Sequence, residues 1–213
     1  MKHNEVTIID LGICNLGNIV RALKVIGANP KVVYEPFDVE HTQMVLLPGV
    51  GAYGKASFAL SERKLRTSIE RFADTGRLLV GICLGMQLLY MRGEEFGSHK
   101  GLELLDGEVK KIPETVSGTN ISLRLPLIGW KHLNGSSVHE SLANSLGFQQ
   151  ASFYFVHSYR AVDYESETLV ATTEYGGHLI PSIVKKNNII GCQFHPERSG
   201  EPGLRLLKNI FQL

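Results

Sequence analysis

Short apolar strands alternate with amphipathic helices through the first half of the chain, and this alternation constrains the fold most. Residues 6–10, 31–35 and 43–49 are short and rich in Val, Ile and Leu, as buried strands are. Apolar residues recur at helical spacing in 18–28 and 55–76, and each segment ends close to a glycine. Strands joined through helices usually pair in parallel with both faces covered. The sequence therefore predicts an α/β fold with a mostly parallel central sheet flanked by helices.

The second half of the chain has a different residue pattern. Its β-branched and aromatic runs are parted by Gly, Asn and Asp, which is typical of antiparallel strands and hairpins. We expect these strands to form an additional small antiparallel sheet, a closing helix to cover 203–213, and 113–124 to be a mobile loop. At 213 residues the chain has the length of one domain, and we expect 1–213 to form one. The strand candidates are 101–113, 151–162, 166–177 and 179–197.

Charge and cysteine content argue against several classes of protein. The 22 Lys and Arg residues nearly cancel the 21 Asp and Glu residues, so we expect neither nucleic acid nor a membrane as partner. No run approaches the about 20 apolar residues of a membrane span, and we expect no signal peptide. The three cysteines are widely spaced, without a C-x-x-C pair. Such spacing favours reduced thiols and a cytoplasmic protein.

The stretch GICLG places Cys83 between Gly81 and Gly85, after the predicted strand 77–82 and before the predicted helix 84–92. This pattern is typical of a nucleophile elbow, in which small residues on both sides permit a sharp turn from strand to helix. The sulfur then lies at a helix N-terminus, where the backbone favours thiolate and the N–H of Leu84 can receive an oxyanion. The alternative is a small buried hydrophobe, the commonest fate of a free cysteine.

A second motif, GCQFHPE, places His195 and Glu197 two residues apart. Residues i and i+2 share a face of an extended chain, and Pro196 keeps the chain from turning helical. The carboxylate could then orient the imidazole toward a nucleophile. A surface His and Glu at a strand end would have the same sequence. A metal site needs a third ligand that the spacing does not offer, and we expect no metal.

A third motif, LPGVGAYG, follows a predicted strand. Its backbone around Val50 and Gly51 could supply N–H groups for an oxyanion, or it could be an ordinary glycine turn. It lacks the Lys of a phosphate-binding P-loop, so phosphate binding is not expected there.

Taken together, LPGVGAYG, GICLGMQLL, YFVHSY and QFHPERSG resemble the class I, triad-type glutamine amidotransferases. Within that family the chain is most similar to the glutaminase subunits of imidazole glycerol phosphate synthases, from about residue 6 to 211. The resemblance implies the fold expected above and no cofactor. It also implies that Cys83 attacks the side-chain amide of L-glutamine, giving a thioester and ammonia.

The resemblance assigns further roles. His195 would act as base and acid, Glu197 would orient it, and Leu84 with Val50 or Gly51 would bind the oxyanion. The resemblance also assigns substrate contacts to Gln87, Glu95, His157, Ser158 and Tyr159. Without the family, Gln87 could be a solvent-facing helix residue, and 157–159 could be a strand end with satisfied polar groups.

The resemblance also implies a partner. In this family ammonia passes to a (β/α)8 barrel synthase (cyclase) subunit, which makes imidazole glycerol phosphate and aminoimidazole carboxamide ribotide in histidine biosynthesis. We therefore expect a heterodimer, with Asn15, Asn18, Trp130 and Tyr154 facing the barrel. Without the family, the two asparagines could be turn and N-cap residues, and the two aromatic residues could belong to the core.

Departures from the family pattern leave other functions open. They comprise Leu11, Cys14, Leu127, Ile128, Lys131 and 177–181, all outside the expected triad. A paralogous glutaminase could instead supply ammonia to a nucleotide-sugar amidating partner in surface polysaccharide synthesis. A cysteine peptidase of similar fold and a catalytically silent binding module are alternatives of other classes. For the glutaminase, we expect activity to fall at acid pH as His195 becomes protonated.

Overall fold

The computed structural model describes residues 5–14 and 16–213. Within that part of the chain, the largest sheet has eight strands in the order β2-β1-β3-β4-β14-β13-β12-β9. The first five of these pair in parallel and the last three in antiparallel fashion. The strands are β1 (Glu5–Ile9), β2 (Asn29–Val33), β3 (Met44–Gly49), β4 (Leu78–Cys83), β9 (Asn134–Gly135), β12 (Leu169–Tyr175), β13 (His178–Lys186) and β14 (Ile189–Cys192).

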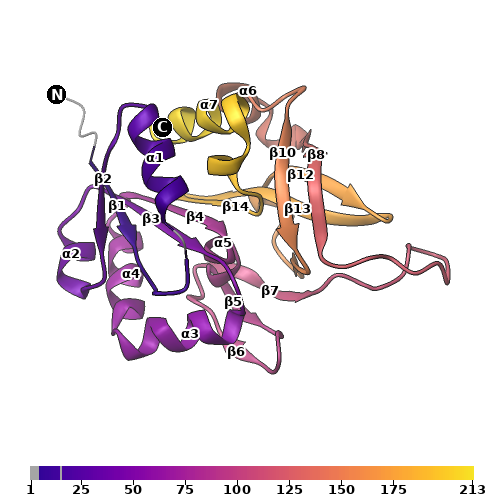
Figure 1. Cartoon of the computed structure of the whole chain (residues 1–213), viewed down its shortest axis with the longest axis horizontal. Coiled ribbons are helices and arrows are strands. Elements are labelled where there is room, and N and C mark those ends of the chain that lie inside the picture. The colour runs from indigo at the N-terminus through magenta and orange to yellow at the C-terminus, as the bar shows by residue number, and fades with distance from the viewer. Residues whose placement is uncertain (1–4, 15) are drawn as a thin grey trace.

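Helices cover both faces of the parallel part of this sheet, as Figure 1 shows. One face carries α1 (Gly17–Val25), α6 (Glu140–Leu146) and α7 (Gly200–Ile210). The other carries α2 (Pro36–Glu40), α3 (Tyr53–Glu62), α4 (Leu65–Asp74) and α5 (Leu84–Leu88). Single 3-10 turns are η1 (Ser137–His139), η2 (Ser166–Thr168) and η3 (Pro196–Arg198). None of the helices in the described ranges combines the length and apolar character needed to cross a bilayer.

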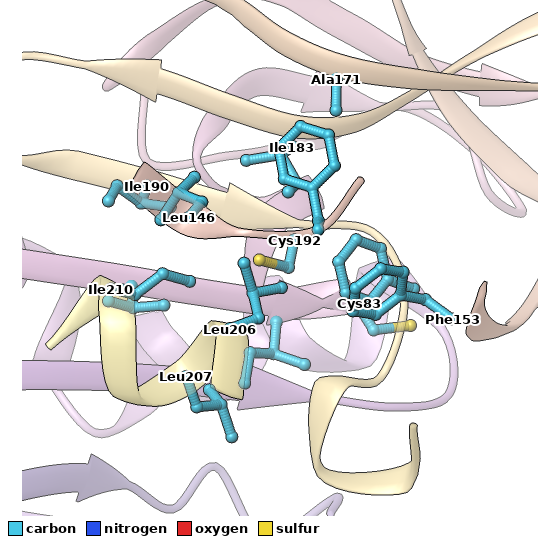
Figure 2. Packing of buried hydrophobic residues seen from close by; sticks show 14 of the residues in the cluster. Cys83, Leu146, Phe153, Ala171, Ile183, Ile190, Cys192, Leu206, Leu207 and Ile210 are labelled. Carbon is cyan, nitrogen blue, oxygen red and sulfur yellow. The ribbon is translucent and has the colours of Figure 1, made fainter. Parts of the chain in front are cut away.

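Side chains of the buried strands alternate between two hydrophobic cores. In β3, Leu46 packs in the core under α1 and α7, whereas Val45 and Leu47 pack in the core under α3 and α4. This is the period of two that a strand imposes on its side chains. Figure 2 shows the first core, in which Cys192 is fully buried and Cys83 also takes part. The sheet is thus buried on both faces, as its apolar runs predict.

Two smaller sheets complete the described fold. One pairs β8 (Leu127–His132) antiparallel with β10 (Ser152–His157). The other has the order β11-β7-β5-β6 and contains β5 (Tyr90–Gly93), β6 (His99–Lys100), β7 (Leu105–Lys111) and β11 (Tyr159–Val162). The β5–β7 pair is parallel and the others are antiparallel. The expectation of a small antiparallel sheet is confirmed in outline, but the strands β12 and β13 extend the main sheet.

The predicted helix over 55–76 is wrong in one respect, because it is two helices. The backbone of Lys64, with φ of 56°, is left-handed and ends α3 before α4 begins. The neighbouring Arg63 donates through Nη1 to the carbonyl of Asp10, at 2.6 Å. This contact joins the break to the end of β1, which lies far away in sequence.

The predicted helix over 84–92 is too long. After five helical residues the carbonyls of Leu88 and Leu89 accept hydrogen bonds from the backbone N–H groups of Leu102 and Leu104, at 2.7 and 2.9 Å. Residues from Tyr90 onward then pair with β7. Distant backbone donors therefore replace the next helical turn.

The segment expected as a loop, 113–124, projects from the body between β7 and β8 (Figure 1). It folds back on itself through a bridge between Thr115 and Ser122. The N–H of Ser117 donates to the carbonyl of Gly176, at 2.8 Å, so the segment also contacts the turn between β12 and β13.

Candidate active site

A cleft of about 770 Å³ opens where β3 and β4 end and the segment after β14 passes. The carboxyl ends of parallel strands are the usual place for ligands in such sheets. Seventeen of the described residues line it, and they include all eleven residues singled out in the sequence for catalysis, oxyanion binding or substrate binding. These eleven are Val50, Gly51, Cys83, Leu84, Gln87, Glu95, His157, Ser158, Tyr159, His195 and Glu197.

Cys83 stands at the junction of β4 and α5 with φ of 54° and ψ of −112°. This is a strained conformation for a residue with a side chain, and such strain is concentrated at functional sites. A Cβ on Gly85 would lie 1.8 Å from the carbonyl oxygen of Leu47, and a Cβ on Gly81 would lie 2.8 Å from the backbone of Met86. Both positions must be glycine for the elbow to close, which explains the GICLG pattern.

His195 and Glu197 form a buried pair opposite the elbow. The ring nitrogen Nδ1 of His195 lies 2.7 Å from Oε1 of Glu197, and both side chains are about 95% buried. Pro196 begins the turn η3 between them. With Nδ1 held by the carboxylate, the proton-exchanging role is left to Nε2, which has no hydrogen-bond partner among the described residues.

The backbone around His195 is tied to β10. The N–H of His195 donates to the carbonyl of Tyr154 at 2.9 Å. The hydroxyl of Ser199 donates to the carbonyl of His195 at 2.6 Å and accepts from the N–H of Tyr154 at 3.0 Å. These three hydrogen bonds fix the imidazole through its main chain.

Neighbouring groups act on the charge state of His195. Burial lowers the pKa of His195, but its interactions with Cys83 and with Glu197 outweigh burial and raise the pKa well above its usual range. These neighbours therefore favour the protonated imidazole over the neutral one. The titration of a ring coupled to such neighbours belongs to the group as a whole, and the expected fall of activity at acid pH stays a prediction.

The glycine turn lies beside the elbow because Gly49 pairs with Cys83 in the register of β3 and β4. A Cβ on Gly49 would lie 3.0 Å from Cβ of Leu84, so the two backbones approach closely. Gly51, with φ of 89°, adopts the left-handed conformation that glycine favours. The backbones of Val50, Gly51 and Leu84 thus face one cleft.

A hydrogen-bonded network forms one wall of the cleft. The amide nitrogen of Gln87 donates to the carbonyl of Tyr159 and to Oε1 of Gln193, each at 3.0 Å. Nδ1 of His157 donates to the same carbonyl of Tyr159, at 2.8 Å. Burial lowers the pKa of His157 to about 4, so this ring is neutral and its Nε2 is an acceptor. Gln87 is therefore a buried residue and not a solvent-facing one.

Glu95 and Ser158 complete the polar lining. The carboxylate of Glu95 accepts a hydrogen bond from the backbone N–H of Tyr53, at 2.6 Å from Oε2, where α3 begins. Ser158 lies between β10 and β11. A negative charge thus stands on the same cleft as the thiol, and it could bind a cationic group of a ligand.

The residues expected at a partner surface are only partly in the cleft. Asn18 lines it, whereas Asn15 lies outside the described residues. Trp130 on β8 is 56% exposed and contacts the ring of Tyr154 on β10 edge to face, with 6.0 Å between centroids. The guanidinium of Arg198 lies 4.6 Å from the centre of the Tyr154 ring. Trp130 is therefore not a core residue, and both aromatic rings belong to an accessible face of the small sheet.

The structure adds residues that the sequence did not single out as part of the site. Cys14 and Arg198 line the cleft. Burial first, and then the charges of Glu197 and Cys83, raise the pKa of Cys14 to about 11, so its thiol is protonated at neutral pH. Gln193 precedes His195 by two residues, and strand alternation could have placed both on one face. Ser199 follows Glu197 without any local pattern that marks its double hydrogen bond.

Comparisons with known proteins agree with this geometry. Residues 7–212 match the family model described as glutamine amidotransferase class-I. The imidazole glycerol phosphate synthase subunit HisH 1 of Legionella pneumophila is 36% identical over 214 residues, covering 99% of this chain and 100% of that protein. Subunit HisH of the same synthase from Lacticaseibacillus casei is 41% identical, covering 98% of this chain and 95% of that protein.

Solved structures show the same fold. A crystal structure of a glutamine amidotransferase superimposes with a TM-score of 0.72 at 17% identity, covering 98% of this chain and 99% of that one. PurLQS from Thermotoga maritima superimposes with a TM-score of 0.71 at 20% identity, covering 100% and 99%. The mostly parallel sheet flanked by helices is thereby confirmed.

Proposed function

The chain belongs to the class-I glutamine amidotransferase family, and we propose that it is the glutaminase subunit of an imidazole glycerol phosphate synthase in histidine biosynthesis. The observation that carries the proposal is the meeting of a strained elbow cysteine with a buried His–Glu pair on one cleft. The full-length similarity to HisH subunits supports the choice of synthase.

In the first step the Cys83 thiolate attacks the side-chain amide carbon of L-glutamine. The C–N bond breaks as the His195 imidazolium donates its proton to the leaving nitrogen, and ammonia departs from a γ-glutamyl thioester. Water, deprotonated by the now neutral imidazole, then attacks the thioester and releases glutamate. Glu197 orients the ring through Nδ1 and stabilises its positive charge whenever the ring is protonated.

The backbone supplies the oxyanion site. The N–H of Leu84, with that of Val50 or Gly51, receives the negative charge that develops on the amide oxygen. The closeness of Gly49 to Leu84 supports this pairing because it brings the two segments to the same point.

The polar wall binds the amino-acid end of glutamine. Glu95 supplies the charge that the substrate ammonium requires, and Gln87, His157, Ser158 and Tyr159 supply neutral polar groups. A cleft with a carboxylate and fixed polar groups at one wall favours the charged amino-acid end of free glutamine over a peptide, and so argues against a cysteine peptidase.

The ammonia is used by a synthase partner, and we propose a (β/α)8 barrel that binds the face bearing Trp130 and Tyr154, with Asn18 on the cleft beside it. Aromatic side chains such as the exposed Trp130 and the half-buried Tyr154 are typical of interface centres. The cytoplasm is the proposed location, which fits three cysteines that are unpaired in the structure.

The paralogue that would amidate nucleotide sugars differs in its partner only. Ile128 is one of the residues that differ from the family pattern, and it is 60% exposed on the same strand as Trp130. The proposed docking face therefore carries a difference from the family sequence. The identity of the co-purifying protein distinguishes the two functions.

The test is to purify the chain with its associated synthase and compare Cys83→Ala with the unaltered protein. We expect Cys83→Ala to lower glutamine-dependent synthesis roughly 10³-fold or more, because the nucleophile is gone. Synthesis from added ammonium should stay within about twofold, since that route bypasses the glutaminase. Imidazole glycerol phosphate is the expected product.

Two results would contradict the proposal. Equal loss of both activities would mean that Cys83 serves the fold and not the glutaminase step. Production of an amidated sugar with no imidazole glycerol phosphate would assign the chain to the paralogous function. Cys192→Ala is the matched control, because that thiol is fully buried in the core and away from the cleft.

A further inference from the structure

The helix α3 begins without a cap of its own. Its N-cap residue is Ala52, whose side chain cannot accept a hydrogen bond from the first turn. The exposed donors of a helix N-terminus need acceptors from elsewhere. Oε2 of Glu95, 42 residues later in the chain, accepts from the N–H of Tyr53 at 2.6 Å and supplies one.

The segment that follows Glu95 is fixed against α3 and α4 at several further points. The hydroxyl of Ser57 donates to the carbonyl of Lys100 at 2.6 Å, and Arg66 donates to the carbonyl of Gly101. The ring of His99 lies so close to Gly54 that a Cβ there would be 2.6 Å from its Nε2. Glu95 is therefore held in place independently of any ligand.

Glu95 also stands beside the catalytic apparatus. Tyr53 follows Gly51 by two residues, so the bond to Tyr53 lies at the end of the glycine turn that we assign to the oxyanion. The same carboxylate lines the cleft together with Tyr159. Burial first, and then the charge of Glu95, raise the pKa of Tyr159, which agrees with the two groups being close.

We propose that Glu95 is a positioning residue for the oxyanion turn as well as a ligand of the substrate ammonium. Oε2 anchors the end of the turn through Tyr53, and Oε1 is left for the ammonium of glutamine. One side chain thus sets the distance between the α-amino group of the substrate and the backbone that receives its amide oxygen. This inference rests on the proposed glutaminase function.

The two roles separate in two variants. Glu95→Gln keeps an oxygen acceptor for Tyr53 but removes the charge, so we expect KM for glutamine to rise about tenfold or more while kcat stays within about twofold. Glu95→Ala removes both, so kcat should also fall about tenfold or more. With glutaramate, the glutamine analogue that lacks the α-amino group, Glu95→Gln should change neither constant more than about twofold, whereas Glu95→Ala should still lower kcat.

A second measurement does not depend on activity. Amide hydrogen exchange of the full chain, followed over residues 50–56, should be at least about tenfold faster in Glu95→Ala and within about threefold of the unaltered chain in Glu95→Gln. Glu94→Ala is the control, because that carboxylate is at the surface, 3.7 Å from Lys110, and should change neither exchange nor kinetics.

Unchanged exchange over 50–56 in Glu95→Ala would overturn the positioning role, and so would equal kcat in the Gln and Ala variants. An unaltered complex that does not hydrolyse glutamine would instead refute the proposed function. In that case the exchange measurement still decides whether Glu95 holds the turn.

Discussion

The two sides of the cleft position their catalytic groups by different physical means. On the β4 side, Cys83 is placed by steric fit, since Gly81 and Gly85 leave no room for another atom. On the β14 side, His195 is placed by the hydrogen bond that its Nδ1 donates to Glu197 and by the backbone hydrogen bonds with β10. We therefore expect almost any added atom on the β4 side to disrupt the structure. On the β14 side, we expect the loss of each hydrogen bond to lower activity by a separate amount.

Gly85→Ala is the substitution on the β4 side for which we expect the largest loss of stability. The added Cβ would meet the carbonyl of Leu47 at 1.8 Å, which neither backbone can avoid. We expect the free energy of unfolding to fall by about 3 kcal/mol or more, measured by urea denaturation. Gly27→Ala is the control, because its φ of 83° is strained but nothing lies within 4 Å, so about 1–2 kcal/mol is expected there. Equal losses in both variants would contradict the steric account.

On the other side, Glu197→Gln should leave the fold intact and weaken catalysis. The amide can keep one hydrogen bond to Nδ1 of His195 but cannot stabilise the imidazolium, so the pKa of His195 should fall. We expect kcat for glutamine to fall roughly 10²- to 10⁴-fold with a small change in KM. A kcat within a few-fold of the unaltered complex would show that the carboxylate only fills space.

His157, on the wall of the cleft, should make the free energy of unfolding depend on pH. Its folded pKa of about 4 is below the unfolded value of 6.5, so the stability due to its neutral ring is fully present above pH 6.5 and is lost as pH falls toward 4. The expected loss is about 3 kcal/mol at the acid end, since one pKa unit corresponds to about 1.4 kcal/mol. Denaturation of the unaltered chain and of His157→Asn at pH 7 and 4.5 checks this. The same pH dependence in both would exclude His157 as its source.

The smallest expected effect is that of Ser199→Ala. The hydroxyl bridges the backbones of Tyr154 and His195, so its loss should cost about 1 kcal/mol of stability. We also expect kcat to fall about threefold to tenfold, because the ring loses one of its backbone supports. Ser145→Ala, which removes a single bond to Ser141 within α6, is the control and should leave kcat unchanged. A Ser199→Ala variant with unaltered kcat would limit this residue to the fold.

The sequence predicted best what local spacing determines. The elbow follows from GICLG because the turn requires glycine on each side of Cys83, and the pairing of His195 with Glu197 follows from their spacing of two. The alternation of apolar strands with amphipathic helices is also a local pattern, and it predicted the parallel sheet. The remaining substrate residues came from a family resemblance and not from their own pattern.

What the sequence could not predict depends on contacts between distant segments. The helix after Cys83 ends at Leu88 because its carbonyl is taken by the N–H of Leu102, and no residue near Leu88 indicates this. The bond from Tyr53 to Glu95 is equally hidden, since 42 residues separate the partners. In the same way, nothing near Cys14 in the sequence indicates that this residue lines the cleft together with Cys83.

The most direct test of the central claim is covalent labelling by 6-diazo-5-oxo-L-norleucine, a glutamine-like electrophile, followed by peptide mass spectrometry of the chain bound to its synthase. The account predicts one label per chain on Cys83, slowed by added glutamine and by His195→Asn. Labelling of Cys14 in place of Cys83, or no labelling at all, would contradict it.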